Sequence, residues 1–109
     1  LIRVIDLKGV VPLVRLSSNN AEQIKRIMDA GSHGVIAPMV NSQEEAESLV
    51  SAVKYPPIGR RSIGLARAQG YGARFSEYFD WQRDHSLVIL LDNNALVHLA
   101  KNSTCLLFQ

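Results

Sequence analysis

The stretch VVPLVRLSSNNAEQIKRIMDAGSHGVIAPMV, residues 10–40, decides the fold, because it reads as strand, helix and strand in succession. The runs 10–17 and 34–40 are apolar and contain β-branched residues, which is typical of strands buried on both faces of a sheet. Residues 20–31 between them have the apolar spacing of an amphipathic helix, and Asn20 is expected to cap its N terminus.

The same alternation continues along the chain. Residues 41–57 are expected to form a second helix, with acidic residues in its first turns and a proline pair at its end. A short helix is expected at 75–84, a third buried strand at 86–91 and a further helix at 93–102. Alternating strands and helices predict βαβ units on a parallel sheet.

A parallel sheet needs cover on both faces, and three strands do not easily provide it. The sequence therefore predicts a partial (β/α)8 (TIM) barrel of about three βα units, or alternatively a doubly wound, flavodoxin-like sheet. The second architecture needs a glycine-rich turn directly after a strand, whereas the glycine-rich loop of this chain follows a helix. In both architectures functional residues lie at the carboxyl ends of strands, here 15–17, 38–41 and 91–93.

Composition narrows the class of protein. The chain has 109 residues, enough for one domain, with 47% hydrophobic and 20% charged residues, which is ordinary globular composition. The net charge of +2 is spread out and forms no basic stripe, so no nucleic-acid partner is expected. No apolar run reaches membrane-spanning length, and the single cysteine fits a cytoplasmic setting. The start without methionine and the apolar tail predict a piece of a larger protein.

The loop YPPIGRRSIGLARAQGYG, residues 55–72, combines four glycines with three arginines. Glycine supplies backbone freedom and arginine supplies fixed positive charge. Together they indicate a loop that closely approaches an anion or the carboxylates of a partner. The alternative is a solvated surface loop, since arginine is common on surfaces.

From about residue 10 to residue 80, the order of PLVR, IKR, MDAG, HGVI, PMV, YPP and GLARA closely resembles the HpcH/HpaI aldolase/citrate lyase family. The resemblance implies residues 1–109 as a fragment of a single barrel domain. It also implies cleavage of a 4-hydroxy-2-oxo acid to pyruvate plus an aldehyde, with Mg, Mn or Co as the divalent metal. A homo-oligomer is expected for the full-length form. Resemblance fades after residue 90, so 90–109 is expected to be a divergent tail.

The resemblance also assigns residues. Arg15 matches the family arginine that contacts the oxo group of pyruvate, where a fixed guanidinium stabilises the developing enolate oxygen. The alternative is that Arg15 only ends a strand and pairs with a nearby acid. Asp92 is the nearest match to a metal-binding glutamate of the family, since hard cations prefer carboxylate oxygens.

The resembled family places the loop 55–72 across the mouth of the barrel, close to a neighbouring subunit. Arg61 and Arg67 are expected to meet substrate carboxylates or acidic residues across that interface, and Gly64 is expected to permit close backbone approach. The family histidine base lies upstream of the region that this chain covers. The three histidines, His33, His85 and His98, are interpreted as surface or packing residues.

A second interpretation belongs to a different class of protein. The chain is then a truncated or degenerate, non-catalytic member with a binding or interaction role. Under either interpretation this fragment alone is expected to be inactive, because parts of the family site lie outside the sequence.

Overall fold

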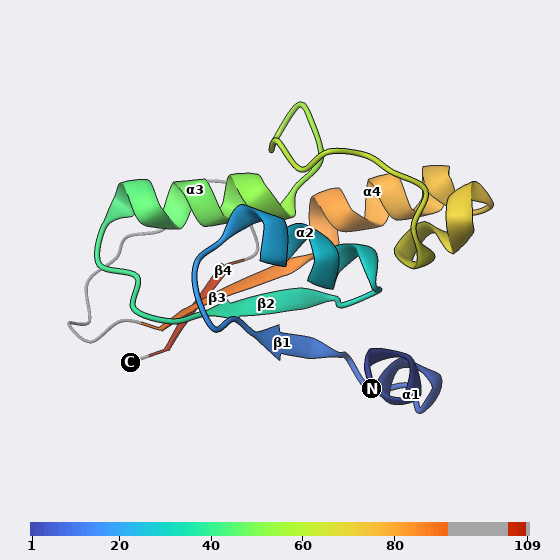
Figure 1. Ribbon diagram of the computed structural model, residues 1–109, viewed down its shortest axis with the longest axis horizontal. Helices are drawn as coiled ribbons and strands as arrows, with labels where there is room; N and C mark the ends of the chain where they lie inside the picture. The colour runs from blue at the N-terminus through green and yellow to red at the C-terminus, as the bar shows by residue number, and fades with distance from the viewer. Residues whose placement is uncertain (92–104, 109) are drawn as a thin grey trace.

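The computed structural model describes residues 1–91 and 105–108. Its elements follow the expected alternation, with a helix at the start of the chain and a strand near its end that the sequence analysis did not predict (Figure 1). In chain order they are α1 (Ile2–Leu7), β1 (Leu13–Arg15), α2 (Ala21–Asp29), β2 (Gly34–Ala37), α3 (Gln43–Val53), the 3₁₀ helix η1 (Arg67–Gly72), α4 (Phe75–His85), β3 (Leu87–Leu91) and β4 (Cys105–Phe108).

The described strands form one parallel sheet with the order β1-β2-β3-β4. Helices α2 and α3 lie on the same face of this sheet (Figure 1). A doubly wound sheet reverses its strand order and carries helices on both faces, whereas a (β/α)8 barrel keeps the chain order and places its helices outside. The expectation of a partial barrel is therefore confirmed, and the doubly wound alternative is wrong.

Two elements depart from the sequence analysis. The apolar tail, in which no strand was expected, contains β4, whose backbone pairs in parallel with β3, so the sheet has a fourth strand. Helix α1 has six residues and no side-chain cap, which explains why no start signal marked it. The helix expected at 93–102 lies outside the described residues. Among the described helices, none is both long and apolar enough to span a bilayer.

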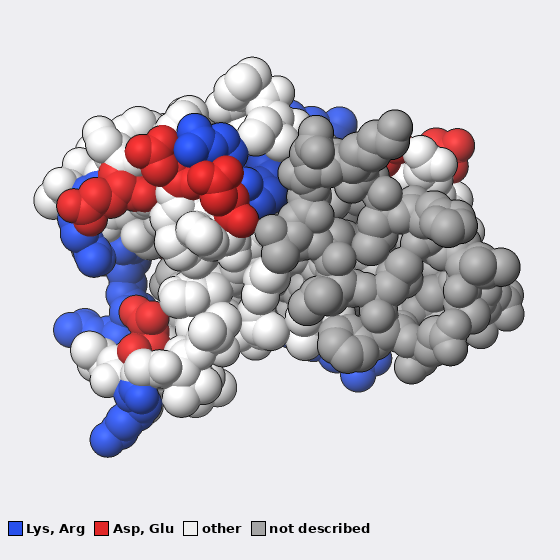
Figure 2. Space-filling view, turned by 180° about the vertical axis from the view of Figure 1, so that it is seen from behind, with Lys and Arg blue, Asp and Glu red and all other residues white. Residues whose placement is uncertain are grey.

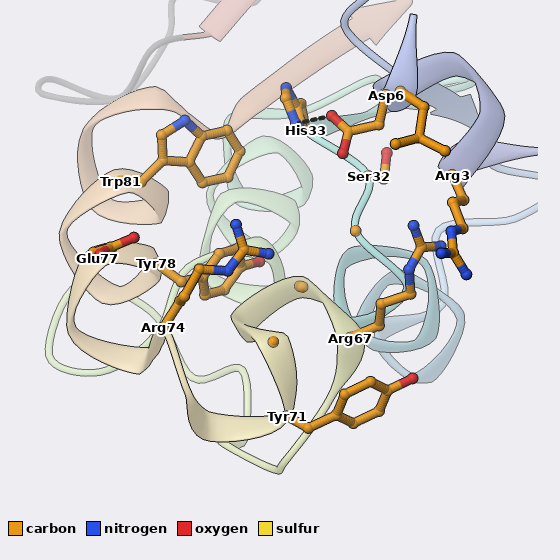
Figure 3. A pocket seen from close by; sticks show the side chains of 14 residues that line it. Arg3, Asp6, Ser32, His33, Arg67, Tyr71, Arg74, Glu77, Tyr78 and Trp81 are labelled. Atoms are coloured by element: carbon orange, nitrogen blue, oxygen red, sulfur yellow. Dashed lines mark ion pairs between the residues drawn. The ribbon is translucent and has the colours of Figure 1, made fainter. Parts of the chain in front are cut away.

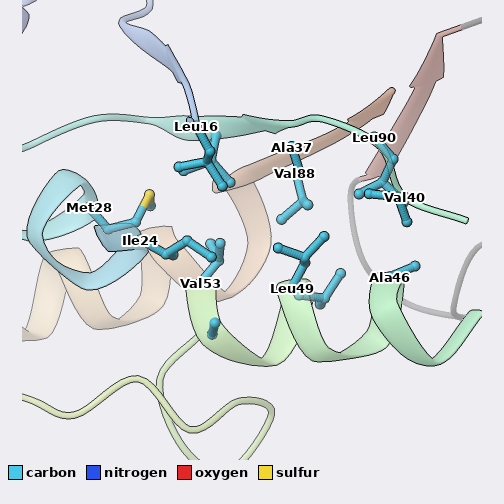
Figure 4. Close-up of a cluster of buried hydrophobic side chains, with 13 residues drawn as sticks. Leu16, Ile24, Met28, Ala37, Val40, Ala46, Leu49, Val53, Val88 and Leu90 are labelled. Carbon is cyan, nitrogen blue, oxygen red and sulfur yellow. The ribbon is translucent and has the colours of Figure 1, made fainter. Parts of the chain in front are cut away.

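The core lies between one face of the sheet and the helices α2 and α3 (Figure 4). Successive residues of a strand point to opposite faces, so every second strand residue joins this core. The core contains residues of the strands and of the helices that are almost fully buried. They are Val35, Ala37, Val88 and Leu90 of the strands and Ile24, Met28, Leu49 and Val53 of the helices. The intervening strand residues therefore face the side away from the helices.

Side chains at the helix starts fix where the helices begin. The Asn20 side chain accepts hydrogen bonds from the backbone N–H groups of Glu22 and Gln23, at 2.8 and 3.2 Å, so the expected cap is confirmed. Ser42 caps α3 in the same way, because its Oγ accepts a hydrogen bond of 3.2 Å from the backbone N–H of Glu45. Each cap lies in the loop that joins the carboxyl end of a strand to the following helix.

Lys54 is the residue that ends α3, and it is only 1% exposed. Its ammonium group donates hydrogen bonds to the backbone carbonyls of Gln82, Arg83 and Ser86, at 2.8, 2.9 and 3.1 Å. These carbonyls lie at the C terminus of α4, where the helix dipole favours a positive charge. Lys54 thus connects the end of α3 to the junction between α4 and β3.

We predict that Lys54→Met lowers the free energy of unfolding by about 1–3 kcal/mol, because it removes the hydrogen bonds that the buried ammonium group donates to the end of α4. Urea denaturation followed by circular dichroism measures this loss. Lys8→Met, at an exposed lysine next to α1, is the matched control and is expected to change stability by less than about 0.5 kcal/mol. Equal stability of the two variants would show that the contacts of Lys54 contribute nothing.

Candidate functional site

The carboxyl edge of the sheet brings together the ends of β1, β2 and β3. Because the strands are parallel, their last residues, Arg15, Ala37 and Leu91, lie at the same edge of the sheet. Backbone hydrogen bonds hold the first turns beyond it, with the N–H of Leu16 donating to Ile36 at 2.9 Å and that of Val40 donating to Leu91 at 3.1 Å. This edge therefore has a fixed backbone on which side chains can be positioned.

Arg15 lies at this edge and faces away from the helices. Its register partner on β2 is Ile36, which is paired in turn with Ile89 on β3, and register partners share a face of a parallel sheet. The next residue, Leu16, is 2% exposed and belongs to the helix-side core, so alternation directs Arg15 to the opposite side. That side corresponds to the interior of a closed barrel.

The Arg15 side chain is exposed and makes no hydrogen bond or ion pair within residues 1–91. The alternative interpretation, in which a nearby acid pairs with it, therefore has no support among the described residues. A guanidinium is charged at any working pH and carries donors suited to an enolate or carboxylate oxygen. Arg15 is thus placed and charged as a binding group for an anionic oxygen.

The loops beside Arg15 are tied to each other. Asn19 Nδ2 donates a 3.0 Å hydrogen bond to the carbonyl of Pro38, which joins the loop after β1 to the loop after β2. Ser17 and Gln23 exchange side-chain hydrogen bonds, with Gln23 Nε2 donating to Ser17 Oγ at 3.0 Å. Gln23 therefore bonds to the loop after β1, and no hydrogen bond joins its side chain to the backbone N–H of Asn20.

Met39 is a feature of this edge that sequence reasoning missed. It has a φ of 54°, in the left-handed region that non-glycine residues rarely adopt, and its side chain is 65% exposed. Asn41 stabilises the turn, because its Nδ2 donates to the carbonyl of Met39 at 3.1 Å and its backbone N–H donates to Glu45 Oε2 at 2.8 Å. No residue preference marks methionine for such a turn, so the sequence held no signal.

The described residues do not form a divalent-metal site at this edge. Within residues 1–91 no group of three His, Cys, Asp or Glu side chains is arranged to hold a metal ion. Glu45 is an acidic residue at this edge, and one of its oxygens already accepts the backbone N–H of Asn41. Asp92, the predicted ligand, lies outside the described residues, although it directly follows the end of β3.

The Gly/Arg loop lies at the opposite, amino edge of the sheet. Helix α3 runs antiparallel to the strands, so the residues after Val53 begin where β2 and β3 begin. The loop then folds back on α3, with the backbone N–H of Arg61 donating to the carbonyl of Lys54 at 3.0 Å. This loop was expected to cross the mouth of the barrel, but within this chain it lies at the amino edge of the sheet.

Arg61 is buried within the chain. It is 3% exposed, its Nη2 donates a 2.8 Å hydrogen bond to Tyr78, and its guanidinium carbon lies 4.2 Å from the ring centre of Tyr55. Asp29 supplies the nearest acidic oxygen, 3.9 Å from Nη1. Burial raises the pKa of Tyr78, and the Arg61 guanidinium partly opposes this rise. Arg61 is thus enclosed by its own chain and does not face an external carboxylate.

The close backbone approach expected at Gly64 occurs instead at Gly59. A Cβ atom at Gly59 would overlap the carbonyl oxygens of Lys54 and Ser51, whereas at Gly64 the nearest atom would be Lys25 Nζ at 3.9 Å. Gly64 and Arg67 are both half-buried on this loop. Their predicted contact with a substrate or a neighbouring subunit stays a prediction.

The chain matches a family model and several characterised proteins. The model of the HpcH/HpaI aldolase/citrate lyase family matches residues 2–109, which includes the stretch expected to be divergent. The hydroxypyruvate/pyruvate aldolase of Rhizorhabdus wittichii is 45% identical over 78 residues, which are 67% of this chain and 31% of that protein. The 4-hydroxy-2-oxo-heptane-1,7-dioate aldolase of Salmonella typhimurium is 36% identical over 100 residues, which are 90% of this chain and 31% of that protein.

Solved structures give the same result. The crystal structure of an HpcH/HpaI aldolase from Desulfitobacterium hafniense superposes with a TM-score of 0.77 at 26% identity, over 87% of this chain and 37% of that one. The chain thus spans about a third of the length of the relatives that it matches. Sequence and structure agree, and the chain belongs to the HpcH/HpaI aldolase/citrate lyase family.

Proposed function

We propose that this chain forms part of an aldolase barrel that cleaves a 4-hydroxy-2-oxo acid into pyruvate and an aldehyde. The observation that carries the proposal is the position of Arg15, on the inner face at the carboxyl edge, without a side-chain partner among the described residues. The names of the relatives, which are aldolases of hydroxypyruvate/pyruvate and of 4-hydroxy-2-oxo-heptane-1,7-dioate, support the same reaction class.

The reaction explains why an unpaired arginine is useful there. Cleavage of the bond between C3 and C4 leaves its electron pair on the pyruvate part, as an enolate, while a base removes the proton of the 4-hydroxyl and the aldehyde forms. The enolate then takes a proton at C3 and becomes pyruvate. Arg15 is proposed to hold the oxo oxygen, on which negative charge develops, because donors aimed at developing charge lower the barrier.

The described carboxyl edge does not hold the whole site. His33 lies at the amino edge, where its backbone carbonyl accepts the N–H of Leu87, so it is not placed to act as the base. We retain Mg²⁺, Mn²⁺ or Co²⁺ as the proposed cofactor, with Asp92 as one ligand, but the described residues do not form such a site and no step is assigned to the cation. A cytoplasmic location and a homo-oligomer of the full-length form also belong to this proposal.

A second candidate function is a binding or interaction role without catalysis. It rests on the stretch after residue 90, where the sequence departs from the family pattern and Asp92 stands at the position of a metal-binding glutamate. A turnover measurement distinguishes the two candidates, because only the first predicts catalysis in a form of the protein that is longer than this chain.

We predict that the 109-residue chain alone releases no detectable pyruvate from a 4-hydroxy-2-oxo acid with Mg²⁺, Mn²⁺ or Co²⁺ present. A cation held by one carboxylate and water keeps most of its hydration shell and binds weakly. A lactate-dehydrogenase-coupled assay measures the release, with a full-length aldolase of the family as the positive control. Metal-dependent turnover that Asp92→Ala abolishes would overturn this prediction and show that the chain builds a complete site.

We predict that Arg15→Lys lowers turnover by about 10²- to 10³-fold in a form of this protein long enough to be active, while the fold is kept. Lysine retains the charge but lacks the planar pair of donors. Steady-state kinetics measure the loss, and circular dichroism checks the fold. The matched control is Arg26→Lys, at an exposed arginine of α2 that is paired with Glu22. Equal turnover of both variants would remove Arg15 from the site.

A further inference from the structure

A cavity lies at the amino edge of the sheet, whereas Arg15 lies at the carboxyl edge. It has a volume of about 710 Å³, within the usual range of small-molecule sites. Helix α1, the turn between α2 and β2, η1 and the part of α4 up to Trp81 line it, and it is open to the surface (Figure 3). Nothing in the aldol reaction uses this space, so its chemistry needs a separate explanation.

Three arginines from three different elements line the cavity. They are Arg3 of α1, Arg67 of η1 and Arg74 at the start of α4 (Figure 3). Among the described residues, none of the three guanidinium groups has a hydrogen bond or an ion pair. In Figure 3, Arg3 and Arg67 lie on one side of the cavity and Arg74 lies apart from them, beside Tyr78. Positive charges around one cavity repel each other, and a bound anion would offset this repulsion.

The other arginines of the helices behave differently. Arg26 pairs with Glu22 at 2.6 Å, and Arg83 pairs with Asp84 at 3.0 Å. Acidic and basic side chains also lie next to one another over the upper part of the face seen in Figure 2. Among the arginines of the described helices, those without a carboxylate partner are therefore the ones that line the cavity.

The acids that line the cavity do not compensate its arginines. They are Asp6 and Glu77, and Asp6 lies 3.3 Å from His33 Nε2, as the dashed line in Figure 3 shows. Two carboxylates thus stand against three guanidinium groups, and one of the two is directed to a histidine. The first turn of α4 also lines the cavity, and no side chain caps its N terminus, so the helix dipole adds positive potential there.

Aromatic rings form the remaining walls. Tyr78 and Trp81 of α4 are stacked with their centres 5.7 Å apart, and Trp81 meets His33 edge to face at 4.9 Å. Tyr71 stands on the opposite side in a left-handed conformation, with a φ of 54°. Backbone strain of this kind is concentrated at ligand-binding sites. The walls therefore suit a flat or apolar organic body that carries the negative groups.

We propose that this cavity binds a small organic polyanion, with two or more phosphate or carboxylate groups held by Arg3, Arg67 and Arg74. Phosphate and carboxylate groups both present anionic oxygens, which a guanidinium group binds in a bidentate manner. The site is separate from the carboxyl edge, so it does not depend on the proposed aldol activity.

The test uses Trp81, which is the single tryptophan of the chain and lines the cavity. Pyrophosphate and citrate are titrated into the 109-residue chain, while its tryptophan fluorescence is recorded at constant ionic strength. We expect a saturable change with at least one of them. The double variant Arg67→Gln/Arg74→Gln should weaken binding by about a hundredfold, since each lost charged hydrogen bond typically costs about tenfold or more.

Arg60→Gln is the matched control, because Arg60 lies on the same loop, outside the cavity, and bonds to Ser48. Its affinity should equal that of the unchanged chain. Circular dichroism checks every variant, and Arg3→Gln, at an exposed residue of α1, replaces the double variant if that one unfolds. Tighter binding of pyrophosphate would identify phosphate as the preferred group of the ligand, and tighter binding of citrate would identify carboxylate. No saturable change with either probe, or equal affinity in the arginine variants, would overturn the proposal.

Discussion

The packing of one face of the sheet against α2 and α3 is the interaction on which the rest of the structure depends. Val35 and Val88 of the strands and Met28 of α2 are all at most 1% exposed in this layer. Once these residues face the helices, strand alternation directs Arg15 and its register partner Ile36 to the other face. Hydrophobic burial on the helix side thus places Arg15, the proposed substrate contact, on the other face, and no side-chain partner is required to hold it there.

The loop 55–72 has three separate reasons for its unusual composition. Gly59 permits close contact with the end of α3, Arg61 is buried against Tyr55 and Tyr78, and Arg67 lines the cavity at the amino edge. Glycine and arginine therefore occur together because the loop must pack tightly and carry positive charge at the same end of the sheet. One loop serves both the stability of the α3–α4 junction and the proposed anion site.

Much of the fold was predictable, because it rests on local patterns. The apolar runs became β1, β2 and β3, and the cap at Asn20 was correct, since these signals depend only on neighbouring residues. The position of the loop 55–72 was not predictable from composition, because it depends on the direction in which α3 returns along the sheet. The burial of Arg61 and the turn at Met39 depend on distant partners or rare backbone angles, which no short motif encodes.

We propose above all that the carboxyl edge beside Arg15 binds the 2-oxo acid. Amide ¹H–¹⁵N chemical shifts of the chain, recorded during a titration with pyruvate, test this claim most directly. We expect shifts that are concentrated at residues 15–17 and 38–41, and that are lost in Arg15→Gln. Shifts confined to residues 55–72, with residues 15–17 unchanged, would contradict it.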